Sequence, residues 1–424
     1  MPDAVVRPRR APLSTWGMRL HRVATAVARV ALRLHLPRRA SARATPKVTI
    51  LLVHAWGMGG TIRTMLNVAG ALAERYDVEV LSVWRTRGQP FFAFPPGVTV
   101  TAADDRRAGA SGRAARVLRR FRGALLFPGD RTAARTTLWS DVQLVRRLRA
   151  SRPDVLIGSR PALNLLVATA GGARALVASE HTPFDAYNAR LKREIARRYG
   201  ALDAVVVLGA AERERLLRAV GAAVPVDVIP NGVPPLRRPG AARLDQPVIV
   251  GAGRLARAKG FDQLIRAFAL VTPPHPEWRL RICGGGEERD ALAALIDQFG
   301  LGERAVLPGR VRDIEAELEA ASVFALSSRL EGLPIVLLEA MAKGLAVVSF
   351  DCSAGVREVI EHGVDGLLVP AGDVLALAHA LVQLIESEVL RRRLGAAATR
   401  KAAAYGLDAM AARWAALIER LTCG

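Results

Sequence analysis

From Lys47 onward, short runs of β-branched and other apolar residues alternate with longer segments that have helical periodicity. The first run, VTILLVHA, is followed by a glycine loop, a helical pattern near Thr64 to Glu74, and a second run, VEVLSVW. The series continues with DVLIGS, ALVASEH, AVVVLG and VDVIPNG. Such alternation predicts a parallel, doubly wound α/β sheet.

The alternation stops at the segment PPLRRPGAARLDQP and then begins again with PVIVGAG, WRLRICGGG, RAVLPGR, SVFALSS and LAVVSF. A chain of 424 residues, 51% of them hydrophobic, is long enough for two cores. We therefore expect α/β domains at residues 47–234 and 247–400. Residues 1–46 would form a basic tail with an amphipathic helix, and residues 401–424 a helix that packs back on the first domain.

Positive charge is concentrated in two segments. The formal net charge is +22, and residues 1–46 hold ten arginines against one acid, while residues 106–149 hold twelve against two. An excess of this kind favours an anionic partner: nucleic acid, lipid headgroups or phosphorylated substrates.

Both segments have apolar faces bordered by arginines. Trp16 to Leu36 has the pattern of a basic amphipathic helix, and Val117, Leu118, Phe121 and Leu125 alternate with arginines in the second segment. Two interpretations remain open, a solvated helix face with a disordered tail and docking to a membrane surface. Nucleic acid is disfavoured because no nucleic-acid motif is recognisable and aromatic residues are few. Since no run of 18 apolar residues exists, we expect no membrane span.

Three cysteines, Cys283, Cys352 and Cys423, lie far apart without the spacing of a zinc site or a disulfide framework. This usage fits a reducing, cytosolic compartment.

The stretch GAGRLARAKGFDQLIRAF places two cations in a loop between a strand and a helix. The strand ends at Gly251 and Gly253 and the helix begins near Phe261, so Arg254 and Lys259 lie in the loop. Loops at the carboxyl edge of a parallel sheet bind ligands, and helix amides with two cations suit a diphosphate. The alternative is that both are ordinary surface cations.

The stretch EGLPIVLLEAMAKGLAVVSF carries two carboxylates around a helix start. Gly332 and Pro334 mark a turn into a helix, which puts Glu331 in the loop and Glu339 in the helix. Both can face a cleft, one meeting a sugar and the other a ribose, because carboxylates accept hydrogen bonds from vicinal hydroxyls. A favourable charge at a helix N-terminus would explain Glu331 alone.

Together these motifs resemble the GT-B-fold glycosyltransferases of family 4, retaining enzymes that use nucleotide sugars. The resemblance extends from Val48 to about Leu421. It rests on WGMGGTIRTMLNVA, IPNGVP, GRLARAKGFDQLIRAF, the pair Glu331-x7-Glu339, and EHGVDGLLVPAGD. The implied fold is two doubly wound Rossmann-like domains facing a central cleft, with the acceptor on the N-terminal side and the nucleotide sugar on the C-terminal side.

The resemblance also implies a role for each site residue. Arg254 and Lys259 would bind the donor diphosphate, Glu339 the ribose, and Glu331 the transferred sugar. His181 would lie near the sugar, although by chemistry alone it is equally a satisfied core histidine. Further donor-binding positions would be Gly59, Gly60, Thr61, Gly253, Arg310, Val311, Gly332 and Leu333.

Retention would proceed by front-face displacement, with no cofactor beyond the nucleotide-sugar co-substrate. The chain contains no Asp-x-Asp, which argues against a metal-dependent transferase. Leu333 and Pro334 depart from the commoner EGFG motif, which puts the sugar contact after Glu331 in question. The segment SFDCSAGVREVI looks like a subgroup that adds hexoses to bacterial surface polysaccharides or their lipid-linked precursors.

The function expected is therefore hexosyl transfer, from UDP-sugar by family preference, to a glycan, glycolipid or lipid-linked acceptor. The enzyme would work in the cytoplasm on the inner face of the plasma membrane. Two alternatives are a GT-B sugar-nucleotide epimerase and a non-catalytic sugar-nucleotide or polymer-binding protein on the same scaffold.

Overall fold

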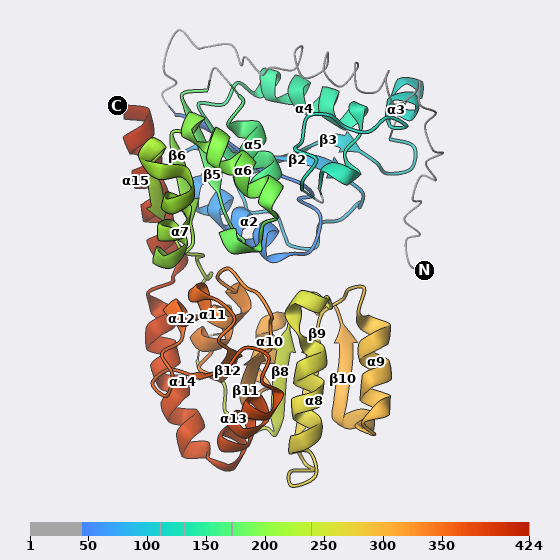
Figure 1. Ribbon diagram of the computed structural model, residues 1–424, viewed down its shortest axis with the longest axis vertical. Coiled ribbons are helices and arrows are strands. Elements are labelled where there is room, and N and C mark those ends of the chain that lie inside the picture. Colours follow the sequence, from blue (N-terminus) through green and yellow to red (C-terminus); the bar gives the residue numbers. More distant parts are fainter. Residues whose placement is uncertain (1–44, 111, 131, 171–172, 239, 424) are drawn as a thin grey trace.

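The computed structural model of the protein describes residues 45–110, 112–130, 132–170, 173–238 and 240–423. These residues form two α/β domains stacked along the long axis of the molecule, with the N-terminal domain uppermost in Figure 1. The amphipathic helix expected from Trp16 to Leu36 lies outside them. Within the described residues, no helix is long and apolar enough to span a bilayer.

The N-terminal domain is built on a sheet of seven parallel strands in the order β3-β2-β1-β4-β5-β6-β7. The strands are β1 (Lys47–Leu52), β2 (Asp77–Arg85), β3 (Thr99–Asp105), β4 (Val155–Gly158), β5 (Ala175–Ser179), β6 (Ala204–Val207) and β7 (Val226–Val228). The connecting helices are α2 (Gly60–Leu72), α3 (Arg113–Leu118), α4 (Leu138–Ser151), α5 (Pro161–Val167), α6 (Ala189–Arg198) and α7 (Ala210–Val220).

The C-terminal domain is built on six parallel strands in the order β10-β9-β8-β11-β12-β13. The strands are β8 (Val248–Ala252), β9 (Arg279–Cys283), β10 (Ala305–Gly309), β11 (Val323–Leu326), β12 (Ala346–Phe350) and β13 (Leu367–Val369). The helices are α8 (Phe261–Val271), α9 (Arg289–Gln298), α10 (Ile314–Glu319), α11 (Ile335–Ala342), α12 (Ala354–Val359), α13 (Val374–Glu386), α14 (Glu388–Ala403) and α15 (Leu407–Cys423). The predicted architecture of two parallel, doubly wound sheets is confirmed.

Each sheet is covered on both faces, which is why its strands are nearly continuous apolar runs rather than alternating ones. All five residues of β5 and of β12 are buried. In the N-terminal domain α4, α5, α6 and α7 contribute to one core, and α2 with α15 to the other. In the C-terminal domain α8, α9 and α13 share one core, while α10, α11 and α12 share the second.

The chain crosses between the domains twice, at adjacent places. Val233 N donates to the carbonyl of Tyr405 (2.9 Å), and Leu407 N donates to the carbonyl of Val233 (3.1 Å). Beyond this point α15 runs back along the N-terminal domain, where Trp414 and Ile418 are buried in the same core as α2 (Figure 1). The last helix therefore ties the C-terminus to the first domain.

The second basic segment is folded differently from its apolar pattern. Helix α3 ends at Leu118, so the expected helical face that continues to Phe121 and Leu125 does not form. The guanidinium of Arg119, directly after the helix, donates to Asp104 and to the carbonyl of Asp105. These contacts turn the chain toward the end of β3 instead of extending the helix.

Candidate active site

The site predicted from the sequence lies where the order of the C-terminal sheet reverses. Strands β8 and β11 are neighbours in that sheet, and the chain leaves them in opposite directions across it. Ligands of doubly wound folds bind outside the carboxyl ends of the strands at this switch point. The loop after β8 carries Arg254 and Lys259, and the loop after β11 carries Glu331.

Lys259 and Glu331 meet directly across these two loops. Lys259 Nζ donates to Glu331 Oε1 at 2.5 Å, and Ser328 Oγ donates to the same oxygen at 2.5 Å. The loops can approach because Gly260 has φ +61° and a Cβ there would lie 2.0 Å from the carbonyl oxygen of Ser327. The structure thus joins two predicted site residues, and it adds Ser328, which the sequence did not single out.

Arg254 lies on the open side of the same edge. Arg254 is exposed to solvent, and no carboxylate pairs with it in the part of the chain that the structure describes. The adjacent backbone is closely packed, since a Cβ on Gly284 would lie 1.7 Å from the carbonyl oxygen of Gly253. Arg310 follows β10, and a Cβ on Gly285 would lie 2.8 Å from its Nε. Glycines in these loops therefore allow the close approach of the Gly253 backbone and of the Arg310 side chain.

Val311 and Leu333 are placed by packing. Val311 is partly buried against the core that α10 and α11 share. Leu333 is buried, and its carbonyl accepts a 2.7 Å hydrogen bond from Asn231 Nδ2 in the segment that crosses between the domains. The loop after Glu331 is thus fixed by the N-terminal crossing, although its sequence departs from EGFG.

Glu339 points from α11 toward the N-terminal domain and forms an ion pair with Arg63 of α2. Its side chain is 8% exposed, and Oε2 is buried with no hydrogen-bond partner among the described residues. Burial raises the pKa of this carboxyl, and the charge of Arg63 opposes the rise. Glu339, the residue predicted to bind the ribose, therefore contacts a cation of the N-terminal domain. Arg63 was not predicted from the sequence, where its signal is its position one turn after the glycine loop.

The start of α2 lies near α11, since Arg63 in its first turn pairs with Glu339, and the glycines there have no side chains. Helix α2 begins at Gly60, Gly59 is its N-cap residue, and Thr61 follows in its first turn. A Cβ on Gly60 would meet nothing within 4 Å. The first amides of a helix have no intrahelical acceptor, so this end can hold an anion.

His181 follows β5 and touches the Glu331 loop. Its Nε2 lies 3.1 Å from Ser179 Oγ, and Nδ1 is buried without a partner among the described residues. Burial lowers the pKa of His181 to about 4, with a further contribution from Arg160, so the ring is neutral at pH 7. A Cβ on Gly332 would lie 2.5 Å from the His181 carbonyl oxygen, so the two backbones are in contact.

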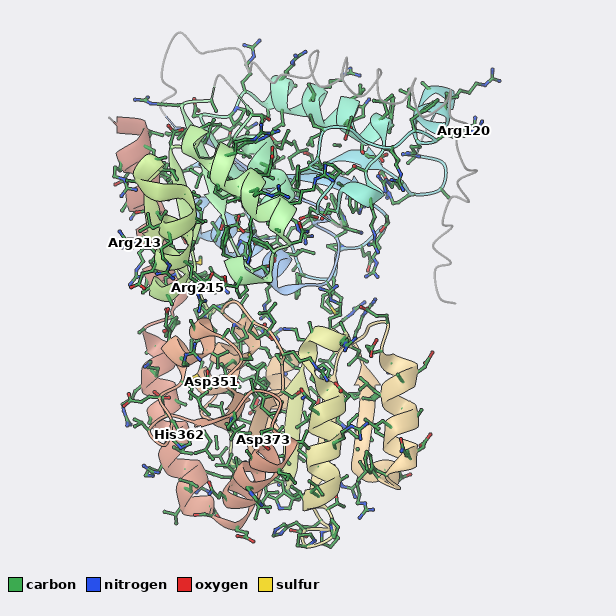
Figure 2. All side chains as sticks on the ribbon, viewed as in Figure 1. Arg120, Arg213, Arg215, Asp351, His362 and Asp373 are labelled. Carbon is green, nitrogen blue, oxygen red and sulfur yellow. The ribbon has the colours of Figure 1, made fainter. Side chains whose placement is uncertain are left out.

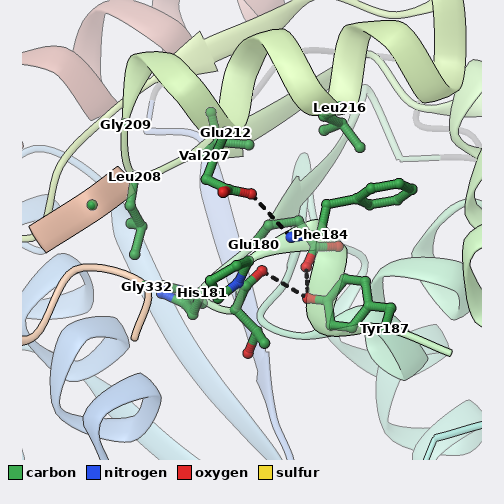
Figure 3. A pocket seen from close by; sticks show the side chains of 13 residues that line it. Glu180, His181, Phe184, Tyr187, Val207, Leu208, Gly209, Glu212, Leu216 and Gly332 are labelled. Carbon is green, nitrogen blue, oxygen red and sulfur yellow. Dashed lines mark hydrogen bonds between the residues drawn. The ribbon is translucent and has the colours of Figure 1, made fainter. Parts of the chain in front are cut away.

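Behind His181 lies a pocket that reaches from β5 to α7 (Figure 3). Glu180 is buried there and accepts hydrogen bonds from Tyr187 (2.5 Å), Asn164 (2.9 Å) and Tyr199. Burial raises the pKa of Glu180, and these donors oppose the rise. This network fixes the turn that carries His181, and it was not predicted from the sequence.

Two family profiles match the chain in succession. Residues 58–237 match Glycosyltransferase Family 4, and residues 234–401 match Glycosyl transferases group 1. An exopolysaccharide phosphotransferase of Streptomyces coelicolor is 36% identical over 388 residues, which span 88% of this chain but 41% of that longer protein. The amylovoran biosynthesis glycosyltransferase AmsD of Erwinia amylovora is 26% identical over 87% of this chain and 98% of its own.

Solved structures with the same fold include TarM of S. aureus, with a TM-score of 0.71 and 14% identity over 88% of this chain and 99% of that one. HepE of Anabaena gives a TM-score of 0.69 with 19% identity over 88% and 99% of the two chains. These likenesses concern the fold, and the family matches divide at the boundary between the two domains described above. The chain is therefore a glycosyltransferase of the GT-B fold, whose N-terminal domain matches the Family 4 model and whose C-terminal domain matches the group 1 model.

Proposed function

We propose that the protein transfers a hexosyl unit from a UDP-sugar to a cell-surface glycan or lipid-linked acceptor, with retention of anomeric configuration. The observation that carries the proposal is the contact between the Lys259–Glu331 pair and His181 through the backbone of Gly332. Three suitable groups thus lie in adjoining loops. Lys259 can bind a phosphate, Glu331 can bind sugar hydroxyls, and His181 supplies a neutral imidazole.

What the relatives bind or make supports this choice of substrates. HepE of Anabaena has been solved with UDP-glucose, and the pneumococcal GtfA with UDP and GlcNAc. A Campylobacter jejuni relative, 26% identical over 86% of this chain, adds N-acetylgalactosamine to a diphosphate-undecaprenol glycan. The Streptomyces relative is named for phosphotransfer, but the present chain matches less than half of it.

In the proposed reaction, the acceptor oxygen attacks C1 from the face that the leaving diphosphate occupies. The bond from C1 to the β-phosphate oxygen breaks, the new glycosidic bond forms, and the acceptor proton passes to a β-phosphate oxygen. Arg254 and Lys259 stabilise the charge that develops on the departing UDP, as do the first amides of α2. Glu331 holds the sugar through its hydroxyls. None of these steps requires a metal or a bound cofactor.

The reaction is tested with purified protein, UDP-hexoses and lipid or polysaccharide extracts as acceptors. Proton NMR of the product should show the same anomeric configuration at C1 as in the donor. An inverted product would refute retention. Epimerised donor without acceptor would identify a sugar-nucleotide epimerase, and UDP binding without turnover would identify a binding protein.

We also propose that the enzyme is peripheral on the inner face of the plasma membrane, with anionic lipid as partner. Val117 in α3 and Phe121 shortly after it are 53% and 44% exposed, and Arg116, Arg120 and Arg122 around them are exposed as well. Figure 2 shows Arg120 at the outer corner of the N-terminal domain. Each basic residue near anionic lipid contributes about 1 kcal/mol, and exposed apolar side chains add insertion energy.

Flotation with phosphatidylglycerol and phosphatidylcholine vesicles tests this membrane contact. Binding should require the anionic lipid and should weaken as salt rises. It should fall in Val117→Ser/Phe121→Ser and after deletion of residues 1–46. Leu375→Ser/Val389→Ser is the matched control, since those residues are 62% and 78% exposed on the C-terminal domain. Equal binding to both vesicles would refute the proposal.

A further inference from the structure

A second charged region lies in the N-terminal domain, at the carboxyl edge of β1, β2 and β3. These three strands are neighbours in register, so the residues that end or follow them come together. His54 follows β1, Arg85 ends β2, and Asp105 ends β3. The same edge carries the loop that leads to Gly60 at the start of α2, so the region borders the cleft.

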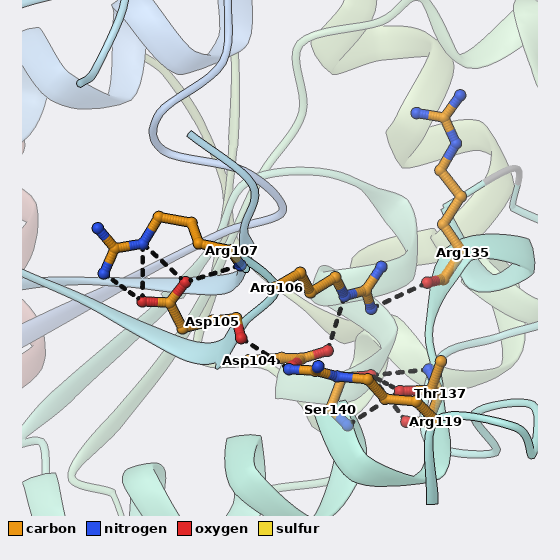
Figure 4. Close-up of polar contacts among 8 residues, drawn as sticks. All are labelled: Asp104, Asp105, Arg106, Arg107, Arg119, Arg135, Thr137 and Ser140. Atoms are coloured by element: carbon orange, nitrogen blue, oxygen red, sulfur yellow. Dashed lines mark hydrogen bonds and ion pairs between the residues drawn. The ribbon is translucent and has the colours of Figure 1, made fainter. Parts of the chain in front are cut away.

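Six arginines lie at or near this edge, together with two carboxylates. Asp104 is fully buried and accepts from Arg106 (2.7 Å) and Arg119 (2.5 Å). Asp105 accepts from Arg107 (Figure 4). The other guanidinium groups belong to Arg85, Arg87 and Arg135. Arg85 interacts electrostatically with Asp105, its neighbour in register, and within the described part of the chain no ion pair joins Arg87 or Arg135 to a carboxylate. Four positive charges are therefore in excess at this edge.

Two of the guanidinium groups are held in fixed orientations. Arg85 stacks on the ring of Trp56 at 4.5 Å and donates to the carbonyls of Arg87 (2.9 Å) and Gly88 (2.6 Å). Arg106 stacks on the ring of Trp84 at 4.8 Å, and its Nη2 donates to the carbonyl of Arg135 at 3.1 Å. A guanidinium held in this way loses little entropy when it binds an oxyanion.

The charges of three of these arginines act on His54. Its Nε2 lies 2.7 Å from Thr86 Oγ1, and its Nδ1 is buried without a partner among the described residues. Burial first, and then the charges of Arg87, Arg106 and Arg135, lower the pKa of His54 to about 4. The imidazole of His54 is thus neutral at pH 7 and adds no positive charge to those of the arginines. Like charges held together raise the free energy of the fold unless an anion neutralises them.

We infer that Arg85, Arg87, Arg106 and Arg135, called the arginine cluster from here on, bind a phosphate or diphosphate group of the acceptor. The assignment to the acceptor rests on the proposed function, in which the donor diphosphate binds Arg254 and Lys259 of the C-terminal domain. Paired guanidinium groups match phosphate oxygens in geometry as well as charge. A glycan attached through phosphate, on a lipid carrier or free, has this chemistry.

The test variant is Arg87→Gln/Arg135→Gln, because neither side chain donates a hydrogen bond to any residue that the structure describes. Arg393→Gln/Arg400→Gln is the matched control, since both arginines are exposed on α14 and neither has an acid partner among the described residues. Calorimetry first measures UDP, which reports on the donor site alone. Pyrophosphate is then titrated into the UDP-saturated protein, so that only a second anion site responds.

We expect the test variant to bind pyrophosphate at least tenfold more weakly than the wild type and the control, with unchanged affinity for UDP. Equal pyrophosphate affinity in all three proteins would overturn the inference. If UDP does not bind, the proposed function fails, and pyrophosphate titrated into the UDP-free proteins still tests the arginine cluster.

The source of the phosphate is distinguished with acceptors. A soluble glycosyl diphosphate, its polyprenyl-linked form in detergent, and a phosphate-free alkyl glycoside are compared by KM. Tenfold higher KM for both phosphorylated acceptors in the test variant would indicate recognition of the phosphate itself, and an effect on the polyprenyl form alone would indicate a lipid-linked acceptor. An equal effect on the phosphate-free glycoside would overturn the inference.

Discussion

Removing Lys259 should separate its contribution to catalysis from its contribution to stability. Its side chain is 27% exposed, while that of Glu331 is 9% exposed and would keep only Ser328 as partner in Lys259→Ala. Breaking a fully buried ion pair costs about 3 to 5 kcal/mol, and the partial exposure of Lys259 reduces this to about 1 to 2 kcal/mol. A melting temperature lower by about 2 to 8 °C follows for the C-terminal domain, because its size falls in the range of about 150 to 250 residues in which 1 kcal/mol shifts the melting temperature by about 2 to 4 °C.

The loss of transfer should be larger than the loss of stability. A cation that stabilises the departing diphosphate contributes about 2 to 4 kcal/mol to the transition state, a factor of tens to hundreds in kcat. Arg254→Ala should lose transfer to a similar extent and keep its melting temperature, because Arg254 is exposed and no described carboxylate pairs with it.

Steady-state transfer and differential scanning calorimetry are measured on Lys259→Ala, Arg254→Ala and Lys259→Ala/Glu331→Gln. The double variant removes the uncompensated charge of Glu331, so its melting temperature should recover while its transfer does not. Wild-type turnover in Lys259→Ala would refute the catalytic role. A melting temperature equally low in the single and double variants would refute the argument from the buried charge.

Three further outcomes follow from other contacts of the cleft. Glu339→Gln should weaken UDP binding about tenfold by calorimetry, since one charge-assisted hydrogen bond to ribose is lost, and unchanged affinity would exclude the ribose role. Gly332→Ala would place a Cβ 2.5 Å from the His181 carbonyl oxygen, so kcat/KM should fall at least tenfold while the circular dichroism spectrum stays unchanged. A wild-type kcat/KM would show that transfer does not need this close contact of the two backbones. His181 has a pKa of about 4 when folded and 6.5 as its reference value, so the unfolded chain takes up the proton first and stability falls as pH drops from about 6.5 to 4. Denaturant titrations should show that His181→Asn removes about 2 kcal/mol of this fall, allowing for partial exposure of the ring, and an identical pH dependence in both proteins would contradict it.

The sheets and the loop positions were predictable because they depend on local sequence. Apolar runs such as AVVSF are buried on both faces of a parallel sheet and therefore have no polar alternation. The loops begin where these runs end, so the sequence was enough to place Lys259 and Glu331 at the carboxyl edge of the C-terminal sheet. That they form an ion pair required the order of β8 and β11 in the sheet, which periodicity does not give.

Contacts across the cleft were not predictable from the sequence. Arg63 reaches Glu339 only because the two domains approach each other, and nothing near either residue indicates the other. The same holds for Glu358 of α12, whose carboxylate accepts from the amides of Ala210 and Ala211 at the start of α7. Helix α3 likewise ends before Arg119, whose guanidinium pairs with the buried Asp104. The helical pattern of the sequence gives no sign of this contact.

The central claim is that the carboxyl edge of the C-terminal sheet holds the donor, with its diphosphate between Arg254 and Lys259. A crystal structure of the protein with UDP bound tests this claim most directly. We expect the diphosphate to lie within hydrogen-bond distance of Arg254 and Lys259 and the ribose hydroxyls to contact Glu339. A UDP diphosphate bound instead to the arginine cluster of the N-terminal domain would contradict it.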